Sequence, residues 1–95
     1  MPGTFEVHSA FAIEDRGLFA LAGEIRDGMV HTGMWADAGD GGDDGAFRER
    51  IHGVEFVDLP AAAGLPVLTF HYRDPAKLAR WSARTWKGRT LSVSP

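Results

Sequence analysis

Five cations near the C-terminal end of the chain have the spacing of a binding surface. Successive members are four, three, four and three residues apart, so on a helix they form a basic stripe along one narrow face. A tryptophan beside them offers a flat ring for stacking on a base. Like charges at this spacing repel by roughly 0.2–0.5 kcal/mol a pair, so the stripe requires solvent, acidic neighbours or a partner. These candidate partner-binding residues are Arg73, Lys77, Arg80, Arg84, Lys87 and Trp86.

Charge is divided unevenly along the chain. Residues 1–72 carry twelve acidic and four basic side chains, whereas residues 73–95 carry one acidic and six basic side chains. The basic stripe is therefore open to three interpretations: a solvated face offset by the protein's own acids, a site for an acidic protein surface, or a site for RNA phosphates. The net charge of −3 disfavours a protein that coats nucleic acid in bulk.

An acidic, glycine-rich segment raises the question of a calcium loop. It contains Asp37, Asp40, Asp43 and Asp44. Counting from Asp40 as the first ligand puts Ile51 where such a loop needs its bidentate glutamate. A solvated polar turn explains the segment better, and we expect no calcium site.

Histidines and serines provide no further chemical site. The histidines have no paired spacing and fall in separate predicted strands, where an outward-facing or hydrogen-bonded side chain is commoner than a zinc ligand; they are His8, His31, His52 and His71. No serine lies in a nucleophile-elbow sequence, and no pair of carboxylates stands out. We therefore expect no metal, no cofactor and no enzymatic activity.

Length and composition indicate one small domain over residues 1–95. The chain is 44% hydrophobic and 24% charged, as in ordinary globular proteins, and its longest apolar run is far shorter than the roughly 20 residues of a membrane-spanning helix. It contains no cysteine and shows no secretory signal. We expect a cytoplasmic protein without a membrane partner.

Alternation of apolar and polar residues predicts that most of the chain forms β-strands. Gly23 interrupts the second and most apolar strand, where we expect a bulge or a close approach of two backbones. The predicted strands cover 4–13, 18–25, a segment that begins at 34–36, 47–58, 67–72 and 90–93.

One helix is predicted before the last strand. Asp74 has the character of an N-cap, Pro75 suits the first helical position, and Gly88 is typical of the residue after a helix. These signals predict a helix over about 75–87. Its apolar residues Leu78 and Trp81 are expected to anchor it on an open end of the sheet.

The glycine pattern resembles that of the second domain of translational GTPases such as elongation factor Tu. It comprises Arg16-Gly17, an apolar strand, Gly23-Glu24-Ile25, Gly28 and, after four residues, Gly33. Segments 51–56, 67–72 and 87–91 are similar to later strands of that domain. The resemblance covers nearly the whole chain and implies a mainly β fold, a small six-stranded Greek-key-type β-barrel, here with one α-helix at about 75–87.

Three features depart from that family. Ala22 resembles an extra residue before the bulge, the segment 37–45 is unusually acidic, and the segment 74–87 is longer and more helical. The chain also lacks the Gly-x-x-x-x-Gly-Lys-Ser/Thr phosphate loop, so no GTP binding by that route is expected. The resemblance thus implies the accessory barrel alone, which in the family contacts the ribosome, aminoacylated tRNA ends or a neighbouring domain.

Two functions of different class follow. The first is a non-catalytic interaction module that binds a protein partner or associates with itself, as exposed strand edges and a basic helix suggest. The alternative is an RNA- or ribosome-associated translation accessory factor that uses the basic helix face. A small molecule inside the barrel is disfavoured, because a 95-residue chain leaves little spare core volume.

Overall fold

The computed structural model describes residues 3–39, 46–56, 60, 62 and 64–95. Within them the chain is mainly β with one α-helix, as predicted. The elements are β1 (Gly3–Ile13), the 3₁₀ turn η1 (Glu14–Arg16), β2 (Leu18–Asp27), β3 (Trp35–Gly39), β4 (Phe47–Arg50), β5 (Gly53–Glu55), β6 (Val67–His71), α1 (Pro75–Ala83) and β7 (Thr90–Ser94).

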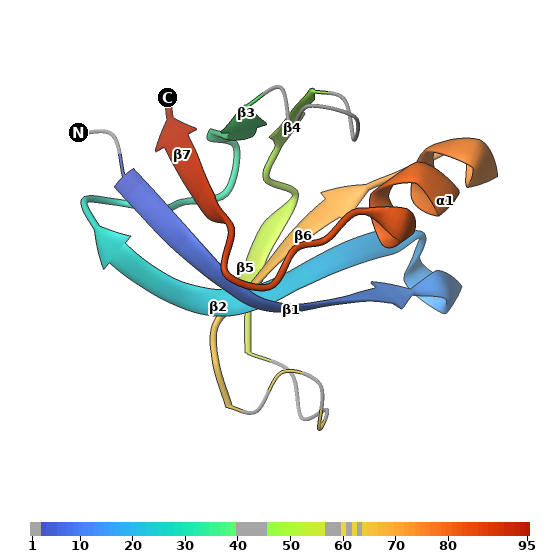
Figure 1. The fold of residues 1–95 in the computed structure, drawn as a ribbon, viewed down its shortest axis with the longest axis horizontal. Coiled ribbons are helices and arrows are strands. Elements are labelled where there is room, and N and C mark those ends of the chain that lie inside the picture. The colour runs from blue at the N-terminus through green and yellow to red at the C-terminus, as the bar shows by residue number, and fades with distance from the viewer. Residues whose placement is uncertain (1–2, 40–45, 57–59, 61, 63) are drawn as a thin grey trace.

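The strands form one antiparallel sheet that curls into a half-barrel (Figure 1). Its order is β4-β3-β7-β1-β2-β6-β5, and the long strands β1 and β2 run through its centre. The two outermost strands, β4 and β5, are consecutive in the chain, with only Ile51 and His52 between them. The two edges of the sheet are therefore connected by a short piece of backbone.

The six expected strands become seven because the predicted strand 47–58 is divided. Its first part, β4, pairs with β3, and its second part, β5, pairs with β6. The change of neighbour occurs at Ile51, whose N–H donates to Met34 O at 2.8 Å, and at His52, whose N–H donates to Thr69 O at 2.8 Å. Residues 57 and 58 of the predicted strand lie outside the described residues.

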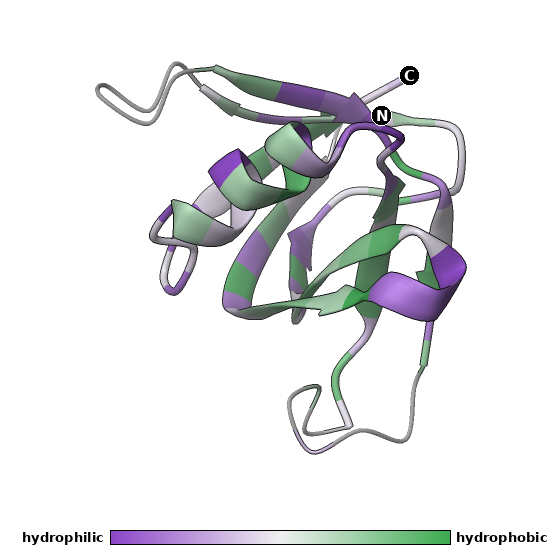
Figure 2. Ribbon diagram, turned by 90° about the vertical axis from the view of Figure 1, so that its right-hand side faces the viewer, coloured by the Kyte–Doolittle hydropathy of each residue, from purple (hydrophilic) through white to green (hydrophobic). Residues whose placement is uncertain are grey.

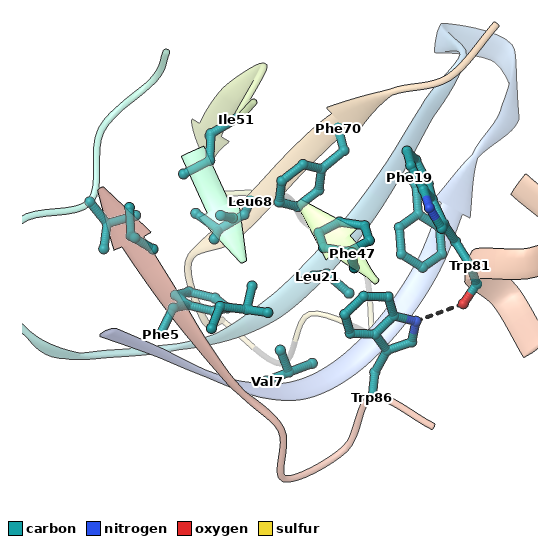
Figure 3. Packing of buried hydrophobic residues seen from close by; sticks show 14 residues of the cluster. Phe5, Val7, Phe19, Leu21, Phe47, Ile51, Leu68, Phe70, Trp81 and Trp86 are labelled. Atoms are coloured by element: carbon teal, nitrogen blue, oxygen red, sulfur yellow. Dashed lines mark hydrogen bonds between the residues drawn. The ribbon is translucent and has the colours of Figure 1, made fainter. Parts of the chain in front are cut away.

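Aromatic and aliphatic side chains fill the concave side of the half-barrel (Figure 3). Phe47 lies at the centre of this core, with its ring centroid 5.3 Å from those of Phe70 and Trp81 and 4.9 Å from that of Trp86. The opposite face of β2 is also covered, because Ala20 and Ala22 pack with Ala62 and Val67. Burial on both faces explains why this strand is continuously apolar rather than alternating.

Gly23 is the site of a close backbone approach, as predicted. A Cβ atom built there would collide with the backbone carbonyl of Glu6 on the neighbouring strand. The bulge itself lies opposite, in β1, where the register shifts between Val7 and Ser9 and His8 is the extra residue. Only glycine fits the second strand at this point.

The helix is shorter than the predicted 75–87. Asp74 caps it as expected, with Oδ1 accepting from Ala76 N at 2.9 Å, but α1 ends at Ala83. Arg84 is extended, with φ −75° and ψ 144°, and its N–H donates to Trp81 O. Gly88 has a positive φ of 83°, but it lies several residues beyond the end of the helix. In Figure 2 the ribbon of α1 has both hydrophobic and hydrophilic segments, as befits a helix with one face on the core.

Part of the acidic segment also differs from the prediction. Asp37 and Gly39 belong to β3 rather than to a loop, and Gly39 N donates to Asp37 Oδ1 at 2.7 Å. Asp40, Asp43 and Asp44 lie outside the described residues. No helix in the described part of the chain is long and apolar enough to cross a membrane.

Candidate partner-binding site at the start of helix α1

The structure divides the predicted basic stripe. Arg73, Lys77 and Arg80 lie at and after the start of α1, and Arg73 and Arg80 are exposed. Arg84 and Lys87 follow the helix, so they do not share its face as predicted. The prediction of a single row of five cations on one helix face is wrong, because α1 ends before the last two of them.

Trp86 is buried and is not a surface ring for stacking. Only 4% of it is exposed, and its Nε1 donates to Trp81 O at 2.7 Å (Figure 3). Arg84 is also buried, at 6% exposure, and its guanidinium carbon lies 5.2 Å from the centre of the Trp86 ring. Trp86 and Arg84 thus belong to the packing of the barrel end.

Lys87 is exposed but faces another region. It lies with Gly88 in a hollow of about 390 Å³ whose other lining residues are Glu6, Val7, His8, Ser9 and Leu65. This hollow adjoins the β1 bulge. Lys87 therefore does not act together with the cations at the start of α1.

Local sequence positions the start of α1 firmly. The backbone N–H of Tyr72 donates to Gly17 O at 3.2 Å, which ties the end of β6 to the turn before β2. Asp74 then caps the helix, and the fixed φ of Pro75 suits its first turn. Lys77 N donates to Asp74 O at 2.9 Å. Arg73 and Lys77 are thereby placed on either side of the cap.

An open hollow of about 670 Å³ lies beside this cap, and we name it the α1 hollow. Two of the predicted cations contribute to it, together with one histidine from the β4–β5 junction and one from the end of β6. Its lining residues are His52, His71, Tyr72, Arg73, Asp74 and Lys77. They are brought together because the β4–β5 junction lies next to the end of β6.

The α1 hollow is lined by two cations, Arg73 and Lys77, and one carboxylate, Asp74, and it has one ion pair at its rim. Lys77 Nζ lies 3.0 Å from Glu49 Oε2 of β4 and 5.3 Å from the centre of the Trp81 ring. Within the described part of the chain Arg73 forms no ion pair. Asp74 faces the helix N-terminus through the Oδ1 that accepts from Ala76 N. Arg73 is thus the cation with most capacity for an incoming anion.

Two imidazoles lie side by side in the hollow. The ring centroids of His52 and His71 are 5.6 Å apart, with an angle of 43° between the ring planes. A neutral imidazole has one N–H donor and one acceptor nitrogen, so the pair adds adaptable polar contacts to the fixed charges. Among the described residues, no group of three His, Cys, Asp or Glu side chains is arranged to hold a metal ion.

Sequence reasoning missed a second cationic surface. Arg48 and Arg50 of β4 have their guanidinium carbons 4.5 and 4.7 Å from the centre of the Trp35 ring on β3. Arg48 also lies 4.0 Å from Asp37. We name Trp35, Arg48 and Arg50 the Trp35 face. The sequence feature that could have identified this face is a pair of arginines at alternate positions of one strand, because such residues lie on the same side of the sheet.

A third group of charges stabilises the outer face of β1 and β2. Arg26 Nε donates to Glu6 Oε1 at 2.7 Å, and its Nη1 lies 3.7 Å from Glu24. The hydrogen bond to Glu6, followed by the negative charges of Glu6 and Glu24, raises the pKa of Arg26. His8 Nε2 lies 3.1 Å from Glu24. These charges compensate one another across neighbouring strands.

Comparison with known proteins gives no assignment: no family model, no curated protein and no solved structure matches the chain.

Proposed function

We propose that the protein is a non-catalytic β-barrel interaction module that docks through the start of α1 onto an acidic protein surface. The observation that carries the proposal is the exposed placement of Arg73 and Arg80, with Lys77 between them in the sequence; Arg73 and Lys77 also line the α1 hollow. Residues 1–72 of a second copy, with a net charge of −8, have the charge that such a site attracts, so self-association belongs to the same proposal.

The burial of the neighbouring tryptophans favours protein over RNA at this site. Sequence-tolerant RNA binding combines cations with aromatic rings on which bases stack. Trp81 and Trp86 are instead held in the core, where they pack against Phe19 and Phe47. The start of α1 thus offers charge without an exposed tryptophan, which suits carboxylates of a protein partner.

An RNA- or ribosome-associated translation accessory factor is the second candidate, and the Trp35 face favours it. There a half-buried tryptophan is flanked by two exposed arginines on a sheet surface. The resemblance to the second domain of translational GTPases supports the same candidate. Gly17, Gly28 and Gly33, which carry that resemblance, all have positive φ in turns. The continuous path from β4 to β5 is also compatible with a six-stranded Greek-key-type barrel.

The experiment is capture of the tagged protein from its native lysate, with and without nuclease, followed by mass spectrometry and by sedimentation of the purified protein. Wild type, Arg80→Glu and Lys87→Glu are compared. Both substitutions reverse one exposed charge in the same segment, but only Arg80 belongs to the proposed surface. We expect a discrete protein, or a second copy, that resists nuclease, is lost with Arg80→Glu and is kept with Lys87→Glu.

Other results would contradict the proposal. Ribosomal proteins that disappear on nuclease treatment would move the function to the RNA candidate. A monomer that retains the same proteins in all three forms would show that the start of α1 is not the docking surface.

A further inference from the structure

We propose that the α1 hollow binds the phosphate group of a small organic phosphate ester. The hollow gathers side chains that donate hydrogen bonds from three parts of the chain: the β4–β5 junction, the end of β6 and the first turn of α1. Its volume of about 670 Å³ is within the roughly 300–1,000 Å³ usual for small-ligand sites. The ligand class follows from charge and from the number of donors.

Arg73 and Lys77 supply the positive charge. A guanidinium has five N–H donors in a plane and suits two oxygens of one phosphate, whereas an ammonium acts as a point charge with three donors. His52 and His71 add ring nitrogens. A phosphate ester, with three terminal oxygens and close to two negative charges, uses these donors more fully than a carboxylate does.

Besides Asp74, the lining carboxylate that caps α1, Glu49 is the internal competitor for this site. Its carboxylate lies 3.0 Å from Lys77 Nζ, and the two side chains are 25% and 36% exposed. A pair this accessible to water is weak, so an incoming dianion displaces it at little cost. The contact with the Glu49 carboxylate shows that the Lys77 ammonium is placed where an anion can bind it. A ligand with a single negative charge should therefore displace the Glu49 carboxylate from Lys77 poorly.

This site shares Arg73 and Lys77 with the proposed protein-docking surface, and Arg80 belongs to the docking surface alone. Arg80 does not line the α1 hollow, although it lies on the same helix as Lys77. Arg80→Glu should therefore reduce partner capture and leave phosphate binding nearly unchanged. Failure of one proposal can thus be distinguished from failure of the other.

The test is titration of the ¹⁵N-labelled protein with phenyl phosphate at pH 7.5, followed by amide NMR. Phenyl sulfate, of similar shape with one charge fewer, is the ligand control. We expect shifts at residues 52, 71–74 and 77, and binding of the sulfate that is at least about tenfold weaker. Arg73→Gln and Lys77→Gln should each weaken phosphate binding by about tenfold or more.

The sharpest variant is Glu49→Gln, because loss of a carboxylate should strengthen binding by about two- to fivefold. Glu55→Gln is its matched control: Glu55 pairs with Arg16 at 3.1 Å, is 29% exposed, and lies outside the hollow. That variant should bind like wild type. The spectrum of each variant reports whether it remains folded.

Three results would overturn the inference. They are the absence of shifts at the hollow, equal binding of phenyl phosphate and phenyl sulfate, and weaker rather than stronger phosphate binding by a folded Glu49→Gln variant.

Discussion

The two ends of segment 73–87 have similar composition but different environments. At its start, Arg73 and Arg80 are exposed; at its end, Arg84 and Trp86 are buried against the aromatic core. Basic residues that belong to one pattern in the sequence therefore have two roles. The first group is available to a partner, and the second closes the end of the half-barrel.

The end of α1 produces this difference. After Ala83 the chain becomes extended at Arg84, which lets Trp86 fold back and donate to Trp81 O. Both tryptophan rings then contact Phe47. A helix continued to residue 87 would place Trp86 more than a full turn beyond Trp81, on a different side of the helix axis. Aromatic packing and this hydrogen bond thus end the helix earlier than the sequence pattern of the segment predicts.

The largest effect is expected from Trp86→Ala. Removal of a buried aromatic ring should lower the free energy of unfolding by about 3–5 kcal/mol, measured by urea denaturation. Trp35→Ala is the control, because the half-buried Trp35 ring chiefly contacts exposed arginines. Trp35→Ala should lower the free energy of unfolding by about 1–2 kcal/mol. Equal losses in the two variants would show that the barrel end is no more tightly packed than the surface.

Arg84→Ala should have the next largest effect. The variant loses a buried stem and its contact with Trp86, and should lower the free energy of unfolding by about 1–3 kcal/mol. Arg80→Ala removes the same side chain from the exposed part of the helix and should change that free energy by no more than about 0.5 kcal/mol. If the two arginines gave similar values, the division of the segment would be wrong.

Asp74→Ala should cost about 1 kcal/mol of unfolding free energy, because it removes the N-cap acceptor of α1. Asp74→Asn retains an oxygen acceptor and should recover most of this loss. Denaturant titration with helix-sensitive circular dichroism would measure both. If Asp74→Ala left the free energy of unfolding unchanged, tertiary contacts alone would determine where the helix begins.

The smallest effect is expected from Glu49→Gln. Its ion pair with Lys77 is partly exposed, so the free energy of unfolding should fall by less than about 1 kcal/mol in urea denaturation. A larger loss would make this pair part of the packing of the fold rather than a displaceable contact at the binding end.

Local signals predicted much of the fold. The alternating strands, the turn glycines, the close approach at Gly23 and the Asp74-Pro75 helix start depend on neighbouring residues, and the structure confirms them. Two features depend on contacts between distant residues and were not predicted. They are the division of segment 47–58 between two neighbours and the early end of α1, which is coupled to Phe19 and Phe47.

The candidate site was predicted in part. Arg73 and Lys77 were recognised from charge and helical spacing, but the same pattern included Arg84 and Lys87, with Trp86 as a nearby ring, and the structure places these three elsewhere. Glu49 of β4 and His52 of the β4–β5 junction join the site from a segment more than twenty residues before Arg73. Their proximity requires the β4–β5 junction to lie next to the end of β6, and no local pattern contains that information.

The most direct test of the account is amide hydrogen exchange of the protein alone and in complex with the partner obtained by nuclease-resistant capture. The account predicts added protection within residues 71–80 and unchanged exchange at residues 35–37 and 48–50 of the Trp35 face. Protection confined to the Trp35 face, with residues 71–80 unchanged, would contradict docking through the start of α1.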